Sequence, residues 1–210
     1  MSRTTRLWVV LCANLALVGA LLAVGLTAHS LGVWAEGADY LADSAAIGVS
    51  LFAIQLASRP PTPSRPDGHP NATRYAAAVN AGWLLTLSLL VAASAIDRLA
   101  VGVHQVHGLP VLIVSAVAAL VMLGGAFLLG ADIDDSPEGP DHDGDLNIQA
   151  VLLDTAADAA AAAGVAVTGG IIYATNGDYW LDPTVALIIA TVVGYHAGRL
   201  LVRITTSLRR

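Results

Sequence analysis

Two pairs of aspartates are the residues in this sequence most suited to chemistry. Asp39 and Asp43 are four residues apart, and so are Asp154 and Asp158. On an α-helix this spacing places both side chains of a pair on one face, about one turn apart. Both pairs lie in apolar segments, where ionisable side chains are costly and usually serve a function. Four carboxylates on two helices are a suitable ligand set for a divalent cation.

The segments that hold these aspartates are long enough to cross a membrane. Apolar runs of about 18 residues or more predict transmembrane helices. At 1.5 Å per residue, Asp39 and Asp43 lie roughly 12 and 18 Å into their span, and Asp154 and Asp158 roughly 9 and 15 Å into theirs. Both pairs therefore come near the middle of a hydrocarbon core about 30 Å thick. Six spans are predicted, over residues 7–28, 31–56, 76–97, 110–130, 148–175 and 183–203.

The composition supports an integral membrane protein. Of the 210 residues, 56% are hydrophobic and only 12% are charged, and the mean hydropathy is +0.68. A soluble domain carries about 25% charged residues. The ten cationic residues are all Arg, and they form no basic patch, so no nucleic-acid partner is expected. The single cysteine, Cys12, excludes a disulfide framework and a cysteine-based zinc site.

Arginine placement predicts the orientation. If the N-terminus is cytoplasmic, nine of the ten arginines fall on the inner side of the six spans and only Arg98 falls outside. Cytoplasmic loops carry such an excess of positive charge. We therefore expect an all-α polytopic, multi-pass protein of the cell membrane, with both termini cytoplasmic and one transmembrane domain over residues 1–210. The inner loop 58–74 is expected to be an extended connector and not a helix, and the inner loop 131–147, which is acidic and rich in Gly and Pro, is expected to be mobile.

Several segments together resemble the cation diffusion facilitator family of divalent metal transporters. The second predicted span, HSLGVWAEGADYLADSAAIGVSLFA, resembles the family's segment of small residues around a DxxxD or HxxxD pair. The fifth, LNIQAVLLDTAADAAAAAGVAV, is similar to the family's second such helix. Gly68-His69 sits where the family has a Gly-His-containing loop, and Asp182-Pro183 is similar to the start of its last helix. The likeness extends over about residues 6–203.

The resemblance implies a transporter and not an enzyme. It implies proton-coupled efflux of a divalent cation from the cytoplasm, with Asp39, Asp43, Asp154 and Asp158 as the transport site. No cofactor is implied beyond the transported ion, and the partners are that ion, protons and the lipid bilayer. The chain ends at Arg210, soon after the last span, so we expect it to resemble members that lack the C-terminal cytoplasmic metal-binding domain. A homodimer through small-residue helix faces is favoured.

Two arguments favour different metals as the transported ion. Family frequency favours Zn²⁺, with Cd²⁺ also transported, whereas an all-carboxylate site suits harder ions such as Mn²⁺ or Fe²⁺. Zinc also accepts carboxylate oxygen in four-coordinate sites. We place zinc first and keep a Mn²⁺ or Fe²⁺ exporter as the alternative. A cation channel and, remotely, an intramembrane aspartyl enzyme are the competing function classes.

Other polar residues are candidates for accessory roles. Glu36 lies three residues before Asp39 and is either an outer exit step or an acid at the membrane interface. Asp67 and His69 form either a weak loop site or a simple turn. His142, in the acidic loop, either helps to concentrate metal near the entrance or belongs to a solvated spacer. His196 is interpreted as an interfacial histidine near the end of the last span.

Overall fold

The described residues fold into six α-helices. In the computed structural model they are α1 (Arg3–Thr27), α2 (Leu31–Ala57), α3 (Ala72–Val101), α4 (Gly108–Asp134), α5 (His142–Thr175) and α6 (Leu181–Leu208). The structure describes residues 3–58, 72–134 and 142–208. Side chains are described over 15–124 and 156–206, except at 47, 50, 51, 54, 57 and 59–71. The described residues contain helices and no strand, which confirms the all-α prediction.

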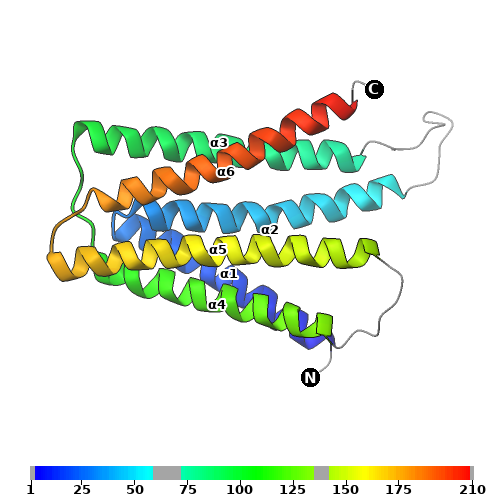
Figure 1. Ribbon diagram of the computed structural model, residues 1–210, viewed down its shortest axis with the longest axis horizontal. Coiled ribbons are helices and arrows are strands. Elements are labelled where there is room, and N and C mark those ends of the chain that lie inside the picture. The colour runs from blue at the N-terminus through cyan, green and yellow to red at the C-terminus, as the bar shows by residue number, and fades with distance from the viewer. Residues whose placement is uncertain (1–2, 59–71, 135–141, 209–210) are drawn as a thin grey trace.

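The helices lie lengthwise and alternate in direction (Figure 1). α4 packs along α5, α3 packs along α6, and α2 contacts α1 on one side and α3 on the other. The beginning of α1 and the end of α6 lie at the same end of the bundle. The short connections α1–α2, α3–α4 and α5–α6 lie at the opposite end, which we call the loop end.

Within the part of the chain that the structure describes in full, three helical segments are long and apolar enough to cross a membrane. They are Ala72–Val101, Ala156–Thr175 and Leu181–Thr206, and two shorter apolar segments are Leu15–Thr27 and Gly108–Gly124. Large apolar side chains face outward from the bundle, among them Leu120 at 68% exposure and Val202 at 63%. Such a surface suits lipid better than water. The prediction of a helical membrane protein is supported, and the number of six spans stays a prediction.

The helices extend further than the hydropathy pattern indicates. The predicted connector 131–147 is partly helical, because α4 continues to Asp134 and α5 begins at His142. The sequence at the start of α5 is acidic, and acidic residues in a first turn favour a helix through its dipole. The predicted outer loop 98–109 is likewise shorter, because α3 ends only at Val101. The hydropathy pattern locates the apolar part of each helix but not the residues at which the helix begins and ends.

Small residues bring neighbouring helices into close contact. A Cβ atom added to Gly169 of α5 would lie 2.6 Å from the backbone nitrogen of Leu112 in α4. One added to Gly108 would lie 2.5 Å from the carbonyl oxygen of Gly169. Where apolar burial offers little gain between helices in lipid, such close backbone approach is a main source of packing energy. The α4–α5 pair therefore depends on these glycines.

Candidate functional site

The helix that carries Asp39 and Asp43 begins after a three-residue turn. His29 adopts a left-handed backbone with φ of 59°, and the Ser30 amide donates to the Gly25 carbonyl at 3.1 Å. This is the Schellman arrangement, which usually places glycine at the left-handed position. The Ser30 hydroxyl accepts from the Val33 amide at 3.1 Å and so caps α2 at its N-terminus. The turn fixes where α2 starts.

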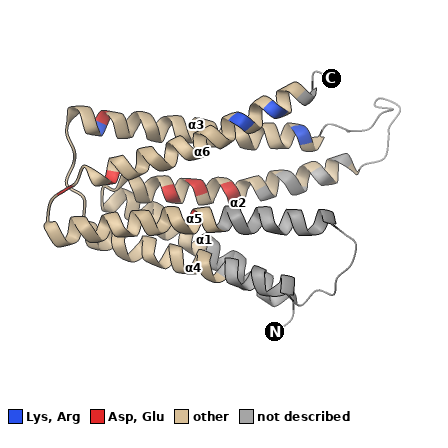
Figure 2. Cartoon of the chain, viewed as in Figure 1, with Lys and Arg blue, Asp and Glu red and all other residues tan. Residues whose placement is uncertain are grey.

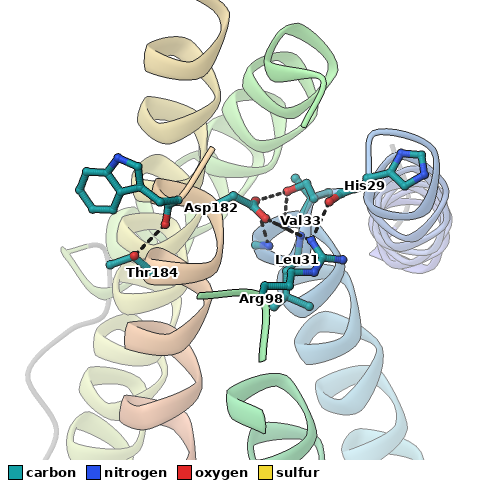
Figure 3. A network of polar contacts seen from close by, with 9 residues as sticks. His29, Leu31, Val33, Arg98, Asp182 and Thr184 are labelled. Carbon is teal, nitrogen blue, oxygen red and sulfur yellow. Dashed lines mark hydrogen bonds and ion pairs between the residues drawn. The ribbon is translucent and has the colours of Figure 1, made fainter. Parts of the chain in front are cut away.

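A buried aspartate from α6 completes this cap. The Leu31 amide donates to Asp182 Oδ2 at 2.7 Å, and the Gly32 amide donates to Asp182 Oδ1 at 3.2 Å (Figure 3). The Ser30 hydroxyl donates to Oδ1 at 2.5 Å. Asp182 is 1% exposed, and its negative charge faces the positive end of the α2 dipole. One carboxylate therefore joins the first turns of α2 and α6.

Arg98, near the end of α3, adds a third helix to this contact. Its Nη1 atom lies 3.8 Å from Asp182 Oδ2 and donates to the His29 carbonyl at 2.8 Å. The arginine balances the buried carboxylate and also satisfies a carbonyl at the end of α1. We call Ser30, Arg98 and Asp182 the loop-end clamp. The sequence indicates Asp182-Pro183 as the start of the last helix, but it does not indicate which groups the Asp182 carboxylate contacts.

The predicted transport-site residues with described side chains line one cavity. Asp39 and Asp43 of α2, Asp158 of α5 and His196 of α6 border a space of about 500 Å³. The three carboxylates are half-buried. The buried Tyr40 hydroxyl lies within electrostatic range of all three, which agrees with their gathering in one region. Acidic residues follow one another along α2 in Figure 2. The fold thus brings aspartates more than 100 residues apart in sequence to the same space.

The remaining predicted residues are only partly placed. Asp154 lies on α5 one turn before Asp158, but its side chain is outside the described residues. The same holds for the side chain of His142, the first residue of α5, while Asp67 and His69 lie wholly outside the described ranges. Among the side chains that are described, no three His, Cys, Asp or Glu residues converge on a common metal position. The four-carboxylate set therefore stays a prediction.

The cavity narrows toward the loop end. Beyond Asp39 only about 20 Å³ is open, between Ala35, Ser88, Val91 and Ala190. That is about the space that one water molecule needs. Ala35, Val91 and Ala190, which line this space, belong to a buried apolar cluster that also contains Leu31, Ala95 and Ala186. The loop-end clamp lies beyond this cluster, at the start of α2 and α6.

Glu36 does not border the cavity. It is 4% exposed, and its Oε2 accepts a hydrogen bond from the Ser115 hydroxyl of α4 at 2.8 Å. Its Oε1 has no hydrogen-bond partner among the described residues, and neither does the buried hydroxyl of Tyr40, one turn later on α2. Glu36 is enclosed between helices, and its interpretation as an outer exit step or as an acid near the interface stays a prediction. Sequence spacing could not show that α4 supplies a serine here.

Comparison with known proteins places the chain in a family. Residues 7–208 match the family described as the cation efflux transmembrane domain. The chain is 28% identical over 177 residues to the zinc transporter ZitB of Yersinia pseudotuberculosis, covering 84% of this chain and 54% of that protein.

Two further relatives give the same result. The human proton-coupled zinc antiporter SLC30A2 is 26% identical over 175 residues, which are 80% of this chain and 46% of that protein. The cadmium, cobalt and zinc/H(+)-K(+) antiporter of Bacillus subtilis is 26% identical over 178 residues, which are 83% and 54%. The chain spans about half the length of the curated relatives it matches. Since the family consists of multi-pass membrane transporters, the match excludes the enzyme interpretation, and the chain belongs to the cation efflux, or cation diffusion facilitator, family.

Proposed function

We propose that this chain exports a divalent transition-metal cation from the cytoplasm in exchange for protons, and that zinc is its main substrate. The observation that carries the proposal is the cavity in which Asp39, Asp43 and Asp158 meet inside an apolar helix bundle. Carboxylates at such a depth are expensive unless a cation or protons balance them. Asp154, one turn before Asp158 on α5, is the proposed fourth ligand.

Competition between metal and protons supplies the coupling. Carboxylates close together in a low-dielectric bundle cannot all be ionised cheaply, so they share protons when no metal is present. A divalent cation must displace these protons when it binds. Metal released on the far side is then replaced by protons from that side. The cycle moves the two kinds of ion in opposite directions.

Zinc is placed ahead of the other metals for two reasons. The relatives named above are a zinc transporter, a zinc antiporter and a cadmium, cobalt and zinc antiporter. Zinc also binds a given nitrogen and oxygen site more tightly than Mn²⁺ or Fe²⁺ does. Cd²⁺ is the expected second substrate. A preference for Mn²⁺ or Fe²⁺ is the alternative that the carboxylate oxygens leave open.

The charge distribution supports a direction of transport. Arg74, Arg199 and Arg203 lie toward the end where α6 finishes, and Arg98 lies at the loop end (Figure 2). With positive charge on the inner side, the ends of the chain are cytoplasmic and six helices cross the membrane. The wide part of the cavity then faces the cytoplasm, and the constricted side faces outward. This arrangement corresponds to an inward-facing state.

A permanently open channel is less well supported. A channel needs a continuous polar path, whereas the space beside Asp39 toward the loop end is only about 20 Å³ and lies within a buried apolar cluster. Closure on one side suits a transporter that opens its two sides in turn. We keep Asp67, His69 and His142 as proposed entrance ligands and Glu36 as a proposed accessory acid. A homodimer is the proposed assembly.

Flux into proteoliposomes tests the proposal. Purified full chain is reconstituted with a zinc indicator and a pH indicator inside, and Zn²⁺, Cd²⁺, Mn²⁺ and Fe²⁺ are compared at fixed membrane potential. We expect saturable zinc flux that speeds up with an opposing proton gradient, together with proton movement in the opposite direction. Saturable flux that ignores the pH gradient would refute the proton coupling. Current that rises in proportion to voltage without saturation would favour a channel.

A further inference from the structure

His196 shares the cavity with the predicted metal ligands. It lies on α6 and borders the same space as Asp39, Asp43 and Asp158, with an exposed side chain. In the sequence it lies in an apolar span with Arg199 three residues later, and this position predicts an interfacial residue. Its position beside three carboxylates asks for a different explanation.

The loop-end clamp gives its depth relative to those carboxylates. Because the Leu31 amide donates to Asp182 at 2.7 Å, α2 and α6 begin at the same level and run in the same direction. At 1.5 Å per residue, Asp43 lies about 18 Å along α2, and His196 lies about 21 Å along α6 from Asp182. The imidazole therefore lies slightly beyond the aspartates, on the side of the wide cavity and away from the constriction.

The ring is held in a way that suits metal binding. His196 Nδ1 lies 3.0 Å from the Val192 carbonyl, one turn earlier on α6. With the proton on Nδ1 donated to this carbonyl, Nε2 keeps its lone pair. Metal-binding histidines nearly always donate their other ring nitrogen to a carbonyl or carboxylate in this manner. The Tyr195 ring lies edge-on to the imidazole, at 5.7 Å between centroids.

The arrangement of the neighbouring groups indicates that His196 binds a metal ion separately from the aspartates. In the part of the structure with described side chains, no three acidic or histidine groups converge on one point, so His196 does not complete a chelate with the aspartates as they lie. A single imidazole ahead of a carboxylate group provides a first contact for an entering cation. Imidazole also binds zinc and its neighbours in preference to Mn²⁺ or Mg²⁺.

We propose that His196 is a metal-binding residue of the transport cavity, which receives the divalent cation through Nε2 before the aspartates do and biases the cavity toward zinc. The inference rests on the proposed function, because it assumes that a metal ion enters this cavity. In this proposal the imidazole nitrogen of His196 favours zinc, because the four aspartates offer only oxygen ligands.

Zinc flux and chemical protection test the role of His196. The full chain is reconstituted as wild type, His196→Ala and His196→Gln, with His104→Ala as the control because His104 is an exposed loop histidine at the loop end. We expect both His196 variants to raise the KM for Zn²⁺ at least about tenfold and to change the KM for Mn²⁺ much less. In wild-type protein, Zn²⁺ should protect His196 but not His104 from diethyl pyrocarbonate, as read by peptide mass spectrometry.

The outcomes separate this inference from the proposed function. If wild type moves zinc, but His196→Ala matches His104→Ala and zinc gives no protection at His196, the inference is wrong and the proposed function stands. If wild type neither binds nor moves any of the metals, both are wrong. The protection measurement uses wild-type protein alone, so a variant that fails to fold does not affect it.

Discussion

The Leu31 amide donates a 2.7 Å hydrogen bond to the carboxylate of Asp182, which lies 151 residues later in the chain. This bond sets the first turn of α2 beside the first turn of α6. Since α2 carries Asp39 and Asp43, the same bond fixes the height of the predicted ligands relative to the α6 residues across the cavity. The clamp therefore positions the site from one end without touching it.

Removing the Asp182 carboxylate should destabilise the protein strongly. Asp182→Ala leaves two α2 amides and the Ser30 hydroxyl without their acceptor, and it removes the carboxylate that balances the charge of Arg98. Breaking a buried charged pair costs about 3–5 kcal/mol. A chain of this size should then lose roughly 6 °C or more in the thermal midpoint of the detergent-purified protein.

The matched control for this change is Asp97→Ala. Asp97 lies on the same turn of α3 as Arg98 and is exposed. Asp182→Asn, which keeps one carbonyl acceptor, should fall between the two alanine variants. Equal midpoints for Asp182→Ala and Asp97→Ala would contradict the structural role of the loop-end clamp.

The hydrogen bond between Ser115 and Glu36 gives a second prediction. Ser115→Ala removes the hydrogen bond to Glu36 Oε2, so that neither oxygen of the buried carboxyl keeps a partner among the described residues. Side-chain hydrogen bonds between membrane helices are worth about 0.6–1.7 kcal/mol, so the free energy of unfolding should fall by about that amount. Glu36→Gln keeps an oxygen that can accept from Ser115, so it should change stability less. Thermal unfolding in detergent measures both variants. The pairing is wrong if Ser115→Ala is as stable as wild type and Glu36→Gln is not.

Close packing of α4 against α5 gives a third prediction. Gly169→Ala places a Cβ atom 2.6 Å from the Leu112 backbone nitrogen, a contact that only a shift of the helices can relieve. Gly164→Ala, on the same helix, meets no atom within 4 Å. The Gly169 variant should lose stability. The Gly164 variant should be neutral or gain up to about 1 kcal/mol, because alanine favours helix over glycine. Similar midpoints for the two variants would exclude this packing as a constraint.

Local patterns in the sequence predict much of the architecture. The apolar runs indicate where the helices are, and the spacing of Asp39 with Asp43 predicts that the two share a face, as their common cavity shows. The same patterns place helix ends poorly. Capping and the helix dipole stabilise polar first turns, and hydropathy does not record either effect.

Contacts between distant segments could not be predicted. Ser30 and Leu31, two of the partners of Asp182, lie more than 150 residues away from it, and Ser115 lies 79 residues from Glu36. Each of these contacts depends on how whole helices rotate and align, and a single sequence carries no spacing rule for that. His196 is an example. The sequence indicates an interfacial histidine, and only the packing of α6 beside α2 shows that it shares a cavity with the aspartates.

Zinc flux by the Asp158→Ala variant tests the central claim most directly. Asp158 joins the α5 side of the cavity to the α2 aspartates, so its loss should remove saturable zinc transport while the protein still folds. The measurement compares zinc entry into proteoliposomes under an imposed pH gradient for wild type, Asp158→Ala and the exposed-residue control Asp97→Ala. We predict flux for wild type and Asp97→Ala, and a loss to the level of empty vesicles for Asp158→Ala. Wild-type flux rates in the Asp158 variant would contradict the account.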